Sequence, residues 1–249
     1  MSRPTADVVV EPDAAALARA VAEALVARLA AAQALHGSAT VVLTGGGIGI
    51  AVLEQVAAVT GGRVDWTAVD VWWGDERFVP RADDDRNEKA ARRALLDVVG
   101  VPADRVHAMA PSDGDFAEPE EAAAWYAGQL AAAAPDGQEV PRLDLLLLGM
   151  GPEGHVASIF PHSPAIGNAR TVAAVRNCPK PPPTRVSLGF PAINAAEEVW
   201  LLVSGDAKAP AVAQALSGAD PAELPAAGVH GTRATRWLLD RAAAAELPG

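Results

Sequence analysis

The chain has 249 residues, a length that fits one large domain or two small ones, and half of its residues are apolar. Its net charge of −11 argues against general binding to nucleic acid or to an anionic membrane, but it leaves room for a basic pocket that holds a phosphorylated metabolite. One cysteine, Cys178, excludes an intrachain disulfide. With no apolar leader and no apolar run of membrane-spanning length, we expect a cytoplasmic protein.

Strand and helix patterns alternate along the first half of the chain. A short strand is predicted at 8–11, and Asp13 is a suitable N-cap for a helix that reaches about residue 35, because leucine and valine recur there every four residues. Buried strands are predicted at 40–44 and 68–73, helices at 48–59 and 87–99, and a strongly charged loop at 74–86.

The second half continues the alternation. The patterns predict strands at 105–107, 143–149, 185–189 and 198–203, helices at 118–134 and 208–216, and a rigid proline-rich loop at 179–183. The segment 234–246 remains open between strand and helix. Regular alternation of this kind predicts an α/β protein with a parallel or mostly parallel sheet covered by helices on both faces.

A histidine follows the most apolar of these strands. Four leucines end on a glycine-rich turn that carries His155. Loops at the carboxyl ends of parallel strands are where α/β proteins place their sites, and histidine exchanges protons near neutral pH. The alternative for a single histidine is a side chain that is merely hydrogen-bonded within its turn. His162 lies seven residues on, but metal-ligand spacing is absent, so no metal site is predicted.

Three consecutive glycines, Gly45, Gly46 and Gly47, join a predicted strand to a predicted helix. Backbone N–H groups at such a junction can approach a phosphate closely, although glycines are also used for a tight turn alone. The loop lacks the Lys-Ser/Thr ending of a P-loop. It also lacks the dinucleotide-binding spacing, because residue 50 is isoleucine.

Charged side chains follow two other predicted strands and open a third. Asp75 and Arg77 lie in the segment Trp-Trp-Gly-Asp-Glu-Arg. An arginine there can bind phosphate through bidentate hydrogen bonds, and a carboxylate can orient a sugar hydroxyl or a histidine. Arg185 opens a strand and Lys208 follows another. The alternative for the Asp-Glu-Arg segment is a solvated charged loop, and the alternative for Arg185 and Lys208 is a surface charge without a function. No Gly-x-Ser-x-Gly segment is present, so a serine-hydrolase triad of the common α/β type is not expected.

Taken in order, these segments resemble the 6-phosphogluconolactonase branch of the glucosamine-6-phosphate isomerase/6-phosphogluconolactonase family. The similarity runs over roughly residues 8 to 240. The matching stretches are 43–47, 71–80 with Asn87 downstream, 144–161, 185–194 and 203–208.

The resemblance implies a Rossmann-like three-layer αβα fold of the sugar-phosphate isomerase and CoA-transferase type, in a single domain over 1–249. It also implies hydrolysis of 6-phospho-D-glucono-1,5-lactone to 6-phospho-D-gluconate, the second step of the oxidative pentose phosphate pathway, without a cofactor. The partner is then a small sugar phosphate, with no nucleic acid or membrane. We expect a monomer, with a dimer as the alternative.

On this basis His155 is the expected general base and acid, with Glu153 or Asp75 orienting the ring. The phosphate is expected at Gly45, Gly46, Gly47, Arg77, Arg185 and Lys208. Two positions depart from the family pattern. The loop 44–49 lacks the usual hydroxyl side chains after its glycines, and Glu153 replaces an aspartate.

Other functions remain open. A glucosamine-6-phosphate deaminase or isomerase would use the same histidine in ring opening. A non-catalytic sugar-phosphate sensor would keep the phosphate ligands and lose the base, so the presence of His155 weighs against it. A dinucleotide-dependent oxidoreductase is disfavoured by the imperfect glycine pattern.

Overall fold

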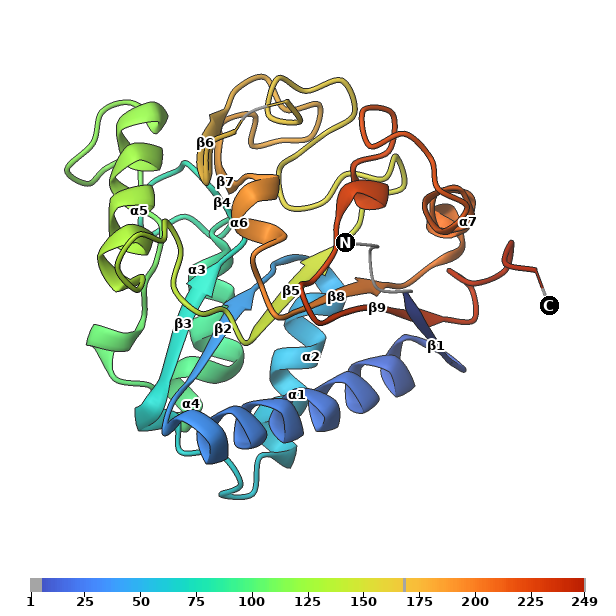
Figure 1. Cartoon of the computed structure of the whole chain (residues 1–249), viewed down its shortest axis with the longest axis horizontal. Coiled ribbons are helices and arrows are strands. Elements are labelled where there is room, and N and C mark those ends of the chain that lie inside the picture. The colour runs from blue at the N-terminus through green and yellow to red at the C-terminus, as the bar shows by residue number, and fades with distance from the viewer. Residues whose placement is uncertain (1–5, 168, 249) are drawn as a thin grey trace.

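A six-stranded, fully parallel sheet forms the centre of the molecule (Figure 1). The computed structural model describes residues 6–167 and 169–248. The sheet order is β1 (Asp7–Glu11), β9 (Ala234–Asp240), β8 (Glu198–Val203), β5 (Leu145–Gly149), β2 (Ala39–Leu43) and β3 (Val69–Trp73). Strands β2 and β8 are buried along their whole length, as expected for a sheet covered on both faces.

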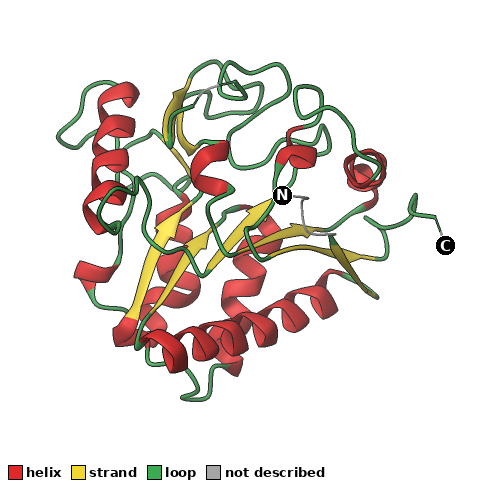
Figure 2. Cartoon of the chain, viewed as in Figure 1, coloured by secondary structure: helices red, strands yellow, loops and turns green. Residues whose placement is uncertain are grey.

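Helices lie on both faces of this sheet, as predicted (Figure 2). Helices α1 (Ala14–His36) and α2 (Gly46–Val59) pack together on one face, beneath the sheet in Figure 1. The side chain of Asp13 accepts the N–H of Ala16 at 2.8 Å, so the predicted N-cap is confirmed. The run α3 (Asn87–Ala91), a π-helical turn (Arg92–Leu96) and α4 (Asp97–Val99) packs against α2.

The other face carries a second, antiparallel sheet that the sequence patterns did not predict. Its order is β4 (Asp75–Arg77), β7 (Arg185–Leu188) and β6 (Val172–Val175). Helix α5 (Pro119–Ala133) packs on this sheet, and α6 (Phe190–Ile193) and α7 (Ala209–Leu216) lie on the same side (Figure 1). The second sheet places charged residues from two distant segments beside the carboxyl edge of the main sheet.

Three local expectations were wrong. The segment 75–77, expected as loop, is a strand that pairs with β7. Its residues are all charged, so they show no strand pattern in the sequence, although the pairing buries Asp75 and Glu76. The strand at 185–189 was expected in the parallel sheet, but β7 lies in the antiparallel one. The segment 105–107 is no strand: a 3-10 turn (Ala103–Arg105) precedes a single bridge between Val106 and Val71. The open segment 234–246 begins as strand β9.

The order of the strands creates a switch point between β2 and β5. From β2 the chain moves outward to β3 on one side, whereas β5 is followed by β8 and β9 on the other. Ligands of open α/β sheets bind in the crevice at the carboxyl ends of such neighbouring strands. The hydroxyl of Thr44, just after β2, accepts the N–H of Gly149, the last residue of β5, at 3.2 Å. The glycine loop and the histidine turn therefore lie side by side.

No helix among the described residues has both the length and the apolar character needed to span a membrane. Buried apolar side chains pack on both faces of the main sheet and form the core of the molecule. Trp72, Trp73 and Trp200 are among the largest of its fully or almost fully buried side chains. Burial of aromatic side chains on this scale is a major source of stability for a domain of this size.

Candidate active site

A cavity of about 810 Å³ opens at the carboxyl edge of the main sheet, a volume in the range of small-molecule sites. The glycine loop, the start of β4, the turn after β5, the loop before β7 and the end of β8 form its walls. It is lined by all the predicted site residues except Glu153: Gly45, Gly46, Gly47, Asp75, Arg77, His155, Arg185 and Lys208. Glu153 lies just behind His155 and lines a smaller adjoining cavity.

His155 is fixed by its turn and by two neighbours. The N–H of Gly151 donates to the carbonyl of His155 at 3.0 Å, and Gly154 adopts φ +82°, a conformation that favours glycine. The imidazole stacks on Phe160 with ring centroids 4.3 Å apart. Its Nδ1 lies 2.9 Å from Oε1 of Glu153. Both the plane and the rotation of the ring are therefore set before any ligand binds.

The surroundings of His155 favour a neutral imidazole. Burial lowers the pKa of His155 below its usual 6.5, and this effect outweighs the opposing attraction of the Glu153 carboxylate. For Glu153, burial alone would raise the pKa, but the hydrogen bond from Lys180 and the other favourable contacts lower it overall. An ionised carboxylate can only accept, so Nδ1 carries the proton and Nε2 keeps a lone pair. This is the protonation state of a general base.

Asp75 is not the partner of His155. Its Oδ2 accepts the hydroxyl of Ser158 at 2.6 Å and lies 3.7 Å from Nη1 of Arg185. Its backbone carbonyl accepts the side-chain amide of Asn87 at 2.9 Å. The sequence left open which carboxylate orients the histidine, and the structure gives that contact to Glu153.

The first turn of α2 offers unpaired backbone donors to the same cavity. The N-cap residue, Gly45, has no side chain to satisfy the first N–H groups of the helix, which also lack partners within the helix. Gly46 adopts φ +79°, and a Cβ on Gly45 would lie 1.9 Å from Oδ1 of Asn87. Both glycines are thus required by the local geometry. Free donors at the positive end of a helix form an anion site.

Lys208 approaches the cavity from the end of β8. It ends a 3-10 turn (Asp206–Lys208) that Asp240 anchors, by accepting the hydroxyl of Ser204 at 2.5 Å and the N–H of Gly205 at 3.1 Å. Burial lowers the pKa of Lys208, and the nearby ammonium of Lys180 adds to this effect. A cation that is disfavoured by both burial and a like charge is strongly stabilised by an anionic ligand.

The two arginines are already partly engaged. Nε and Nη2 of the buried Arg185 donate to the carbonyls of Pro182 and Lys180 at 3.1 Å, which leaves Nη1 towards Asp75. The guanidinium of Arg77 donates to the carbonyl of Asp85. Arg185 therefore shapes the wall of the cavity and keeps one nitrogen for a ligand.

Sequence reasoning missed three members of the site. Lys180 donates to Oε2 of Glu153 at 2.9 Å, Ser158 binds Asp75, and the amide of Asn87 fixes the start of β4. Lys180 stands among prolines, a context that favours a purely structural loop. Ser158 follows His155 by three residues, but no spacing rule links it to a carboxylate 83 residues upstream.

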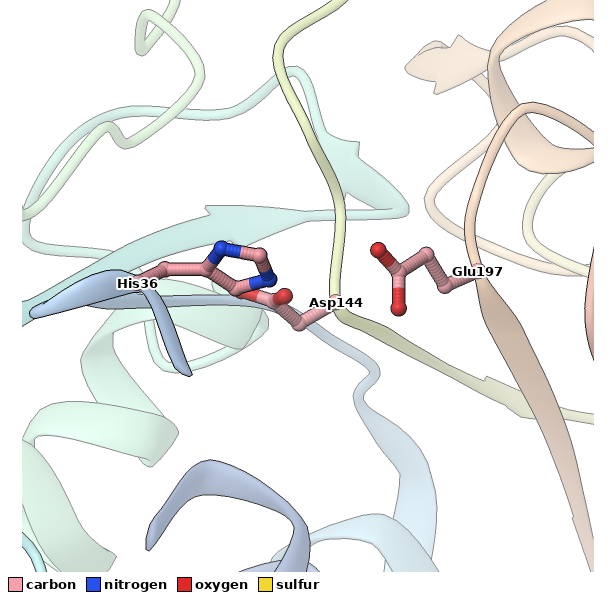
Figure 3. Close-up of side chains that lie close together, drawn as sticks. All are labelled: His36, Asp144 and Glu197. Carbon is pink, nitrogen blue, oxygen red and sulfur yellow. The ribbon is translucent and has the colours of Figure 1, made fainter. Parts of the chain in front are cut away.

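A separate group of His36, Asp144 and Glu197 has the spacing to hold a metal ion among the described residues (Figure 3). It lies at the opposite, amino-terminal edge of the sheet. Asp144 already accepts the N–H of Thr40 at 2.8 Å and Nε of Arg142 at 3.0 Å. Arg28 binds Glu197 at 2.8 Å. Guanidinium groups neutralise both carboxylates, so this cluster is a structural ion-pair network.

Comparisons with known proteins show the family of the chain. The family model for glucosamine-6-phosphate isomerases/6-phosphogluconolactonase matches residues 12–237. A 6-phosphogluconolactonase of Mycobacterium tuberculosis is 54% identical over 239 residues, covering 95% of this chain and 96% of the relative. One of Streptomyces coelicolor is 51% identical, covering 98% and 95%. The structure of 6-phosphogluconolactonase from Trypanosoma brucei has a TM-score of 0.84 at 27% identity, covering 99% of this chain and all of the other. The chain belongs to the glucosamine-6-phosphate isomerase/6-phosphogluconolactonase family.

Proposed function

We propose that this chain hydrolyses 6-phospho-D-glucono-1,5-lactone to 6-phospho-D-gluconate, the second step of the oxidative pentose phosphate pathway. The observation that carries the proposal is His155, hydrogen-bonded to Glu153 and with its pKa lowered by burial, near an anion site formed by Lys208 and an uncapped helix N-terminus in the same cavity. A base and an anion site together fit a phosphorylated substrate with an electrophilic carbon. The relatives named 6-phosphogluconolactonase, which match this chain over nearly their whole length, support this choice. The proposal includes a single-domain monomer in the cytoplasm.

In the proposed mechanism Nε2 of His155 removes a proton from water as the water oxygen attacks C1 of the lactone. The carbonyl becomes an oxyanion, for which backbone N–H groups of the glycine turns are the donors. The imidazolium then returns its proton to the ring oxygen as the C1–O bond breaks. Glu153 stabilises the imidazolium between the two steps. General acid-base catalysis of this kind is typically worth about 10²- to 10⁴-fold in rate.

The phosphate group is remote from C1 and serves to position it. We assign it to the N–H groups of Gly46 and Gly47 and to Lys208, with Arg77 and Nη1 of Arg185 as further cations. Gly45 allows the close packing of Asn87 that shapes this loop. Binding energy collected at the phosphate brings C1 to the base at no cost during the chemical step. The altered loop 44–49 thus binds through its backbone.

Asp75 has a different role in this proposal. Ser158 and Arg185 hold its carboxylate at the cavity wall, where its remaining lone pairs accept hydrogen bonds from sugar hydroxyls. The steps of the reaction use only side chains, backbone groups and water.

A coupled assay tests the proposal. Glucose-6-phosphate dehydrogenase generates the lactone, and its disappearance is followed with and without this protein, with spontaneous hydrolysis subtracted. We expect rapid disappearance. Ammonia release from glucosamine 6-phosphate, with no effect on the lactone, would instead establish the deaminase. Binding of 6-phosphogluconate with turnover of neither compound would establish a sensor.

A further inference from the structure

We propose that Lys180 is a positioning residue of the lactone hydrolysis: its ammonium holds one oxygen of Glu153 so that the other is presented to His155. The inference rests on the proposed function. It assigns a catalytic task to the proline-rich loop 179–183, which the sequence alone marked only as rigid.

The Glu153 carboxylate is shared between two partners. Its Oε2 lies 2.9 Å from Nζ of Lys180, and its Oε1 lies 2.9 Å from Nδ1 of His155. A glutamate has one more rotatable bond than an aspartate, so its carboxylate has more positions available. Contacts from Lys180 and His155 to opposite oxygens select one of these positions. Lys180 thereby supports the longer carboxylate that stands where the family pattern has aspartate.

The backbone of Lys180 is itself held in place. The buried Arg185 donates to the carbonyls of Lys180 at 3.1 Å, Pro181 at 3.4 Å and Pro182 at 3.1 Å. The N–H of Cys178 closes the loop on the carbonyl of Pro183 at 2.9 Å. Proline rings fix φ in the same stretch. The lysine therefore extends from a rigid base, anchored to β7, towards Glu153.

The contact is suited to orientation more than to stability. The Lys180 side chain is 43% exposed and that of Glu153 is 32% exposed, so the ion pair adds little to folding. The His155 side chain is only 16% exposed, and small displacements of its partner move the base. The charge of Lys180 also helps to keep the pKa of Glu153 low and lowers the pKa of His155. The lowered pKa of His155 favours a neutral ring, and the lowered pKa of Glu153 favours an ionised carboxylate.

A phosphate ligand is the competing role for the same side chain, because Lys180 also lines the large cavity and lies near Lys208. The two roles predict different kinetics. A phosphate ligand acts on substrate binding, so its loss raises KM. A positioning residue acts on the base, so its loss lowers kcat and changes the pH dependence.

The test compares Lys180→Met and Lys180→Arg with wild type, with Lys89→Met as the matched control. Lys89 is a partly exposed lysine that pairs with Asp84 outside the cavity. For Lys180→Met we expect kcat to fall about 10- to 100-fold, as for a misplaced catalytic group, with KM changed by less than roughly threefold. The acid limb of kcat/KM should move to higher pH, because a cation that depresses the His155 pKa is gone. Lys180→Arg should recover part of kcat.

Two results would overturn the inference. One is a kcat for Lys180→Met within roughly twofold of wild type. The other is a rise in KM with the pH profile unchanged, which would make Lys180 a phosphate ligand. Thermal unfolding of each variant confirms that it is folded. Failure of the proposed function is distinct, since wild type itself would then leave the lactone unhydrolysed.

Discussion

Oε1 of Glu153 lies 2.9 Å from Nδ1 of His155, whereas Asp75 is hydrogen-bonded to Ser158. Glu153 and Asp75 thus have separate partners, and of the two only Glu153 is hydrogen-bonded to the histidine. In the proposed mechanism Glu153 selects the tautomer with the proton on Nδ1 and stabilises the imidazolium once the ring has taken a proton from water. Each element of this arrangement can be tested by substitution.

Glu153→Gln should reduce kcat by up to about 10⁴-fold, the scale seen when the carboxylate of a histidine dyad becomes an amide. The carboxylate raises the pKa of His155, so its loss should also move the acid limb of kcat/KM to lower pH. The exposed pair of Glu223 and His162, 3.4 Å apart, provides the control: Glu223→Gln should leave both quantities unchanged. Equal rates for Glu153→Gln and wild type would remove Glu153 from the mechanism.

Gly151→Ala should disturb the dyad without unfolding the chain. A Cβ at this position would lie 2.1 Å from Nδ1 of His155 and 2.7 Å from Oε2 of Glu153, so both side chains must shift. A displacement of that size is expected to lower kcat about 100-fold. Gly128→Ala, on α5 with open space around the new Cβ, is the control and should add about 0.5–1 kcal/mol of stability. A normal kcat in Gly151→Ala would show that the dyad tolerates displacement.

Lys208→Met should weaken the binding of 6-phosphogluconate and raise KM for the lactone. Loss of one charge-assisted hydrogen bond to phosphate corresponds to about 10- to 100-fold in affinity. Calorimetric titration with 6-phosphogluconate, together with steady-state kinetics, measures both. An effect confined to kcat would place Lys208 at the reacting carbon and away from the phosphate.

The local parts of the site were predictable, and its long-range contacts were not. The leucine run before His155 and the glycines at 45–47 are local signals of a strand end and a helix start, and the structure places both at the switch point. Strand β4 is entirely charged, and β6 is a run of only four apolar residues. Neither segment indicates its pairing with β7, because the pairing joins distant parts of the chain. The choice of Glu153 over Asp75 was equally out of reach. It depends on Ser158 and Arg185 occupying Asp75, which only packing decides.

Asp144→Ala should destabilise the fold while leaving the site intact. Asp144 is fully buried at the amino edge of the sheet, where it faces Arg142 and Arg28. Removal of one partner from a buried ion-pair network costs about 3–5 kcal/mol. Urea denaturation measures the loss, and Asp136→Ala, an exposed position, should change stability by less than about 0.5 kcal/mol. A large fall in kcat of folded Asp144→Ala would connect this edge to catalysis.

The most direct test of the role of His155 is a pH series. It compares wild type with His155→Ala in hydrolysis of the enzymatically generated lactone. Burial lowers the pKa of His155, so the base is neutral at pH 7 and wild-type kcat/KM should fall only as pH drops below 6.5. His155→Ala should lose at least about 10²-fold in kcat, together with this acid limb, and still bind 6-phosphogluconate. Turnover by His155→Ala at near the wild-type rate, with the acid limb retained, would contradict the assignment of His155 as the base.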